Sequence, residues 1–139
     1  MRRVIVGFGN DLRGEDGFGI EVVKQLQKYP LKNTKLIRTF QLTPELALEL
    51  QEFDEIIFVD AAHSDTNHYT LACNLEKTNQ NTISHHISIE MILSILNSLY
   101  DSFPIFQVYS MLTNSYDIVK NQEKYNENII KTVKYIKNL

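Results

Sequence analysis

The chain has 139 residues, 43% of them hydrophobic, and a formal net charge of −3. That length suits one domain with an ordinary buried core, which we expect to span residues 1–139. The slight excess of acidic residues argues against nucleic-acid binding, because phosphate recognition needs a concentrated basic face. The single cysteine, Cys73, excludes a disulfide framework and an all-thiolate metal site, and we expect it to be a small buried apolar group.

The chain also lacks the apolar segments that mark membrane or exported proteins. No run approaches the roughly 18 apolar residues of a membrane span. The apolar stretch that follows Arg2 and Arg3 breaks at Asn10, which is too early for an export signal. We therefore expect a cytoplasmic protein.

A strand followed by a glycine-rich loop opens the chain. Residues 3–8 form a β-branched run that is typical of a strand buried on both faces. All five glycines then fall between positions 7 and 19, in the run GFGNDLRGEDGFG. Glycine reaches positive φ without steric cost and lets another group approach the backbone closely. Because Glu15 and Asp16 lie within this run, it indicates a functional site rather than a hairpin.

Helices and strands alternate after this loop. Apolar spacing predicts a helix over residues 18–28, a strand over 35–40 and a helix that Thr43 caps and Pro44 begins. The next elements are a strand over 56–59, a partly polar edge strand over 69–75 and a loop over 76–82. A helix over 88–100, capped by Ser88, and a strand over 105–111 follow. The chain then forms a C-terminal helix with an apolar stripe that we expect in the core: Tyr125, Ile129, Val133 and Ile136. This order predicts one three-layer α/β/α domain, with a mostly parallel twisted sheet of about five strands and helices on both faces.

Three polar residues lie near the expected carboxyl ends of the strands, where open parallel sheets bind ligands. Asp16 lies in the glycine loop, Asp60 directly follows the strand over 56–59, and His85 precedes the helix over 88–100. Two carboxylates and one imidazole suit a divalent metal such as zinc, nickel or cobalt. Such a site leaves coordination positions open and can polarise a carbonyl or activate water.

Each of these residues also has a simpler interpretation. Asp60 could cap the turn that follows it, and Asp16 could pair with Arg13 or cap the next helix. Either of the neighbours His85 and His86 could be a surface or packing residue. The remaining histidines are expected to face solvent: His63 and His68.

A dinucleotide-binding loop is the competing interpretation of the glycines. Gly7 and Gly9 match the first two glycines of that motif, but Leu12 stands where the third is required. Glu15 and Asp16 would also bring negative charge toward a pyrophosphate, which is electrostatically unfavourable. Nucleotide binding is therefore the least favoured hypothesis.

Three motifs occur together in the chain and carry a family resemblance. The first is the glycine run over 7–19, which fits the pattern G-x-G-N-x-L-x-x-D-[DE]-G-x-G with Glu15 in place of the first acid. The second is the pair Asp60-Ala61 after a strand. The third is HHISI over 85–89, which fits the pattern H-x-[LM]-[GSP]-[LI] except for Ile87. In these motifs the chain resembles the maturation endopeptidases of nickel–iron hydrogenases. The segment QLTPEL over 41–46 is similar to the branch associated with soluble bidirectional hydrogenases.

The resemblance implies a twisted α/β sandwich and a peptidase that removes a C-terminal extension from the hydrogenase large-subunit precursor after nickel insertion. The family's metal-contacting acid, second acid and histidine map onto Asp16, Asp60 and His85, as catalytic and metal-contacting residues, with His86 as the fallback. The substrate would carry the nickel, and the protein would be a monomer or weak oligomer. Either a metal-bound water or an ionised aspartate could assist the attack.

One stretch departs from the family pattern. Residues 110–115, after the expected fifth strand, lack the glycine and proline that relatives often place there. A non-catalytic, nickel-recognising assembly factor on the same fold is therefore the alternative function.

Overall fold

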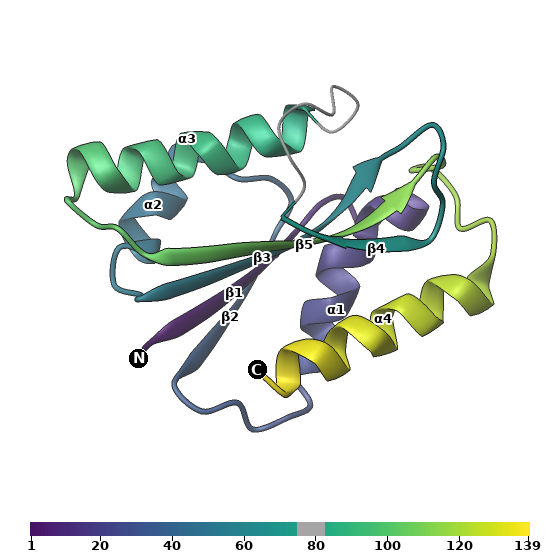
Figure 1. The fold of residues 1–139 in the computed structure, drawn as a ribbon, viewed down its shortest axis with the longest axis horizontal. Coiled ribbons are helices and arrows are strands. Elements are labelled where there is room, and N and C mark those ends of the chain that lie inside the picture. The colour runs from purple at the N-terminus through teal and green to yellow at the C-terminus, as the bar shows by residue number, and fades with distance from the viewer. Residues whose placement is uncertain (75–82) are drawn as a thin grey trace.

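The sheet has five strands in the order β2-β1-β3-β5-β4 (Figure 1). A computed structural model describes residues 1–74 and 83–139, with side chains described outside 83–88. The strands are β1 (Arg3–Phe8), β2 (Thr34–Thr39), β3 (Glu55–His63), β4 (Thr70–Cys73) and β5 (Ile105–Thr113). β1 pairs in parallel with β2 and β3, β3 pairs in parallel with β5, and β4 is antiparallel to β5. The predicted fold class, a mostly parallel sheet with helices on both faces, is confirmed.

Helices cover both faces of this sheet (Figure 1). α1 (Phe18–Leu26) and α4 (Gln122–Lys137) pack on one face, and α2 (Pro44–Leu50) and α3 (Ile83–Leu99) pack on the other. Each face of the sheet thus has its own hydrophobic core. The predicted apolar stripe of α4 is buried in the core that α1 and α4 cover: Tyr125, Ile129, Val133 and Ile136. No helix within the described residues combines the length and apolarity needed to cross a membrane.

Alternation along β3 supplies both cores. Ile57 and Val59 point into the core beneath α1 and α4, whereas Ile56 and Phe58 point into the core beneath α2 and α3. Asp60, the next residue after Val59, therefore belongs to the face that α2 and α3 cover.

Two strands extend beyond their predicted ends. β3 and β5 remain paired from Glu55 opposite Ile105 to His63 opposite Thr113. Asp60 consequently lies inside β3 rather than after it, and residues 110–113 belong to β5 rather than to a loop. The predicted strand is too short because Asp60 marks its end in the sequence pattern, although Ala61 and Ala62, which follow it, remain buried.

The predicted helix starts were only partly right. Thr43 stands at the N-cap of α2 with Pro44 after it, but the Thr43 side chain makes no capping hydrogen bond. α3 begins at Ile83, so Ser88 lies inside the helix and does not cap it. The segment 83–88 contains no glycine or proline that would stop the helix from extending back. The loop expected over 76–82 falls outside the described residues.

The edge position of β4 is confirmed, and it decides the environment of the cysteine. Cys73 is the last residue of this strand and is exposed. The prediction that it is buried was wrong, because an edge strand has a neighbour on one side only.

Candidate functional site

The glycine run from the end of β1 to the start of α1 packs too closely for side chains, as Gly9 and Gly19 illustrate. Gly9 has φ +139°, and a Cβ there would clash with the Asp16 carbonyl oxygen. A Cβ on Gly19 would clash with the carbonyl oxygen of Val59 in β3. The glycines therefore let the 3-10 helix η1 (Gly14–Gly17) and the start of α1 lie directly against the ends of β1 and β3.

Asp16 is held in η1 and is 8% exposed. Its Oδ2 accepts a hydrogen bond from the backbone N–H of Asn10 at 3.1 Å. The simpler interpretations of Asp16 are not supported: Arg13 forms its ion pair with Asp117 at 2.7 Å, and Gly17 occupies the N-cap of α1. Asp16 is thus a buried carboxylate fixed by the backbone of the glycine loop.

Asp60 is 2% exposed in the middle layer of the molecule. Its Oδ1 accepts a hydrogen bond from Ser110 Oγ at 2.5 Å, and the two residues are opposite each other in β3 and β5. Because the residues after Asp60 continue the strand, the turn-cap interpretation of this carboxylate is wrong.

The structure brings Asp16 and Asp60 to the same edge of the sheet. Gly7 is paired with Val59, so Asp60 lies one residue beyond that pair, while Gly9 contacts the backbone of Asp16. Tyr116 is next to Asp16, whose backbone N–H donates to the Tyr116 carbonyl at 3.3 Å. Burial, and then the negative charges of Asp60 and Asp16, raise the pKa of the Tyr116 phenol. Two buried carboxylates therefore share this edge, with Tyr116 beside Asp16.

The third predicted residue, His85, lies in the first turn of α3 rather than before it. α3 covers the face of the sheet to which Asp60 belongs, and its first turn lies at the end of the sheet where β3 and β5 finish (Figure 1). The side chains of His85 and His86 fall outside the described residues. Among the residues whose side chains are described, no group of three histidine, cysteine, aspartate or glutamate residues could hold a metal ion.

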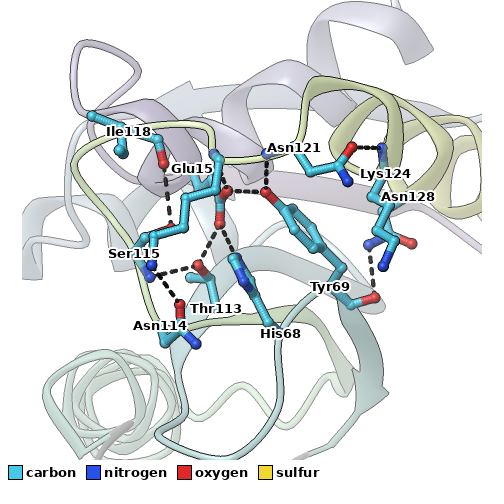
Figure 2. A network of polar contacts seen from close by, with 11 residues as sticks. Glu15, His68, Tyr69, Thr113, Asn114, Ser115, Ile118, Asn121, Lys124 and Asn128 are labelled. Atoms are coloured by element: carbon cyan, nitrogen blue, oxygen red, sulfur yellow. Dashed lines mark hydrogen bonds and ion pairs between the residues drawn. The ribbon is translucent and has the colours of Figure 1, made fainter.

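Glu15, the neighbour of Asp16, is fully buried at the centre of a hydrogen-bond network (Figure 2). Its Oε1 accepts from His68 Nε2 at 2.8 Å and from the hydroxyl of Thr113. Its Oε2 accepts from the hydroxyl of Tyr69 at 2.5 Å and from the backbone N–H of Lys120 at 3.1 Å. Four donors thus saturate this carboxylate, and it has no lone pair left for a ligand.

The network changes the protonation of its members. Burial raises the pKa of Glu15, but hydrogen bonds from Thr113, Tyr69, His68 and the Lys120 backbone outweigh burial, and the pKa is lowered. Burial and the hydrogen bond to Glu15 together raise the pKa of Tyr69 to about 12. Glu15 is therefore a stable anion, and Tyr69 a stable donor to it.

Sequence reasoning missed this network. His68 was expected to face solvent, but its ring stacks on Tyr69 with a centroid distance of 3.8 Å and binds Glu15. His63 is only partly exposed and binds Asp65 at 2.8 Å. The sequence signal for this network was Glu15 itself, a second acid directly before Asp16. Its partners could not be found from the sequence, because nothing in the chain order links Glu15 to residues 68 or 113.

The network also joins segments that are far apart in sequence. The Tyr69 hydroxyl accepts from the Asn121 N–H at 2.6 Å, and Asn121 Oδ1 caps α4 by accepting from the Lys124 N–H at 3.1 Å. Asn128 of α4 donates to the Tyr69 carbonyl at 2.9 Å. The start of β4, the end of β5 and the start of α4 are thereby fixed around η1, which carries Asp16 (Figure 2).

Comparison with known proteins identifies the fold. No family model matches the sequence, and no curated protein matches it. Solved structures do match. One is the hydrogenase maturating endopeptidase HybD from E. coli, with a TM-score of 0.81, 19% identity, and coverage of 98% of this chain and 90% of that one. Another is the NiFe hydrogenase maturation protease HycI from Thermococcus kodakarensis, with a TM-score of 0.78, 19% identity, and coverage of 99% of this chain and 90% of that one. An uncharacterized protein from Wolinella succinogenes also matches, with a TM-score of 0.65, 17% identity and coverage of 99% and 96%. The chain therefore has the fold of the solved hydrogenase maturation endopeptidases.

Proposed function

We propose that this protein is an endopeptidase that removes a C-terminal extension from a nickel-loaded hydrogenase large-subunit precursor. The observation that carries the proposal is the pair of buried carboxylates, Asp16 and Asp60, at the carboxyl edge of a sheet with this fold. The position of His85 in the first turn of α3, at the same end of the sheet, agrees with it. The names of the matching structures supply the reaction class.

The chemistry of the donor set fits a cation that arrives with the substrate. Asp16 is oriented by the Asn10 N–H and Asp60 by the Ser110 hydroxyl, so each carboxylate is fixed before the substrate binds. Carboxylate and imidazole groups suit nickel, and Asp16, Asp60 and His85 would contact the nickel that the precursor holds. The nickel would act as a Lewis acid at that edge. Two buried acids without a cation repel each other, so cleavage would depend on nickel loading.

The direct test is cleavage of a purified precursor, followed by intact-mass spectrometry. We expect loss of a C-terminal peptide from the nickel-loaded precursor and none from the nickel-free precursor. Asp16→Asn and Asp60→Asn should slow cleavage at least about 100-fold, because each removes a charge that meets the cation. His85→Ala should do the same, whereas the matched control His86→Ala should retain activity.

The same measurement separates the alternative functions. An assembly factor would bind the nickel-loaded precursor and leave its mass unchanged. A nucleotide-binding protein would neither bind nor cleave the precursor, and a nucleotide would raise its Tm. The buried acids of the glycine loop disfavour such a ligand. An unchanged precursor mass with the wild-type protein would end the endopeptidase proposal.

A further inference from the structure

We propose that a groove between α1 and α4 binds the C-terminal extension of the precursor. The inference rests on the proposed function, which supplies the precursor whose extension would lie there. The groove consists of two adjoining pockets of about 570 and 300 Å³. Gln25 of α1 and Ile130 of α4 line both pockets, so the groove is continuous. Figure 1 shows the two helices side by side on one face of the sheet.

One end of the groove adjoins the segment that carries Asp16. Gly14 and Gly17, which begin and end η1, line the larger pocket. α1 starts directly after η1, and the backbone just before α4 donates a hydrogen bond to Glu15 of η1. Both helices therefore begin at the end of the sheet where Asp16 lies, and they run away from it. A peptide that leaves the site across η1 would enter the groove.

The groove combines a buried apolar floor with an exposed apolar side chain. Tyr125 and Ile129 line the larger pocket and are buried, whereas Ile130, where the two pockets meet, is 66% exposed. The α4 positions that line the groove recur every three or four residues from Gln122 to Lys137, so they form one face of the helix. This face offers apolar contacts to the side chains of an extended peptide.

The charges along the groove change sign between its two ends. Asp11 and Glu21 line the pocket next to η1, where Lys24 pairs with them at 3.6 and 3.3 Å. Lys134 and Lys137 line the other pocket, and neither forms an ion pair within the part of the chain that the structure describes. Two ammonium groups thus lie at the end farther from Asp16. They suit a carboxylate of the extension, because the carboxyl end of the extension points away from the cleaved bond.

The length of the groove predicts how much of the extension it holds. Gln122 and Lys137 are about 22 Å apart along α4, at a rise of about 1.5 Å per residue. An extended chain advances about 3.3 Å per residue, so about seven residues of the extension would span the groove.

Binding of the purified nickel-free precursor, which we expect to stay uncleaved, tests the groove directly. Ile130→Asp puts a charge where the two pockets meet, and it should raise the Kd about tenfold. Leu48→Asp is the matched control, because Leu48 is 59% exposed on α2, across the sheet, and its loss should leave the Kd within about twofold of the wild type. Both variants should keep Tm within about 3 °C of the wild type.

A charge reversal tests the basic end of the groove. Lys134→Glu should raise the Kd about tenfold, because it replaces a partner of the carboxylate with a repelling group. Lys131→Glu makes the same change on the same helix, but Lys131 lines a different pocket, beside β4, and its Kd should stay within about threefold of the wild type. With the nickel-loaded precursor, Ile130→Asp should raise KM about tenfold and leave kcat within about threefold.

A precursor without its extension shows whether the extension is what the groove binds. The wild type should bind it about tenfold more weakly than the complete precursor, and Ile130→Asp should bind it as the wild type does. The inference fails if the two groove variants bind the complete precursor like their controls, or if they lose the same factor with the shortened precursor.

These outcomes separate the groove from the proposed function. If the wild type cleaves the precursor and the groove variants match their controls, the endopeptidase proposal stands and this inference fails. If the precursor keeps its mass but only the groove variants lose binding to it, the groove holds the extension and the endopeptidase proposal fails.

Discussion

Glu15→Gln is the substitution that most directly tests how the site is held. The glutamine has nearly the same shape as Glu15, so it changes the hydrogen bonding without creating a cavity. Its amide oxygen can accept two of the four donors that reach Glu15, while its NH₂ group faces the other two. The variant therefore leaves two buried donors without a good acceptor and removes the charge that strengthens the remaining hydrogen bonds.

The size of the effect follows from these two losses. A buried hydrogen bond to a charged group contributes about 1.5–3 kcal/mol, and the hydroxyls of Tyr69 and Thr113 can rotate to relieve part of the mismatch. We expect the free energy of unfolding to fall by about 3 kcal/mol, which corresponds to a Tm about 10 °C lower for a chain of this length. Glu21→Gln is the matched control. Its carboxylate pairs with Lys24 at 3.3 Å on the surface, and its loss should change stability by at most about 0.5 kcal/mol.

The acid dependence of stability gives a second test of the same substitution. The pKa of Glu15 is lowered in the folded protein from its ordinary value of 4.5. Its charge therefore stabilises the fold above pH 4.5, and this contribution disappears as the pH falls through the folded pKa. Urea unfolding of the wild type and Glu15→Gln should show the largest difference at neutral pH and a smaller one below pH 4.5. A difference under 1 kcal/mol, or one that stays constant from pH 7 to pH 3, would refute the network's role.

Three other substitutions probe the packing of the site. Gly9→Ala should lower the free energy of unfolding by about 3 kcal/mol, because its Cβ would meet the Asp16 carbonyl at φ +139°; a thermal scan that matches the wild type would contradict that packing. Ser110→Ala should cost about 2 kcal/mol in urea unfolding, because Asp60 loses a buried donor, and an unchanged midpoint would mean that the hydrogen bond contributes little. Leu12→Ser should change Tm by less than 2 °C, because Leu12 is 90% exposed, and a larger fall would show that Leu12 packs against the fold.

Much of the fold could be predicted because its signals are local. Apolar runs mark β1, β3 and β5, and the stripe from Tyr125 to Ile136 marks α4 as a core helix. Boundaries were less predictable, since pairing across the sheet decides them. Asp60 ends an apolar run in sequence, yet β5 continues to pair with β3 for three more residues after it. A polar residue can stay inside a strand when a neighbour such as Ser110 satisfies it.

The site could be predicted in part for a related reason. The glycine run marks a loop that lies close to other backbone, and the order of strands brings Asp60 to the same edge as Asp16. The roles of Asp16, Asp60 and His85 stay predictions. Tyr116 and the Glu15 network could not be inferred, because their partners come from loops whose spacing carries no periodic signal.

The difference between Glu15 and Asp16 shows why composition cannot assign such roles. The two acids are adjacent in η1, and each is buried. Glu15 accepts hydrogen bonds from four donors. These bonds connect η1 to the start of β4, the end of β5 and the start of α4, so Glu15 has a structural role. Within the part of the chain whose side chains are described, the Asp16 carboxylate accepts from the Asn10 N–H alone, so it keeps acceptor positions that Glu15 does not have. The number of donors that reach a carboxylate therefore distinguishes the structural acid Glu15 from Asp16, for which we propose a contact with the substrate's nickel. For Glu15 that number depends on residues more than fifty positions away.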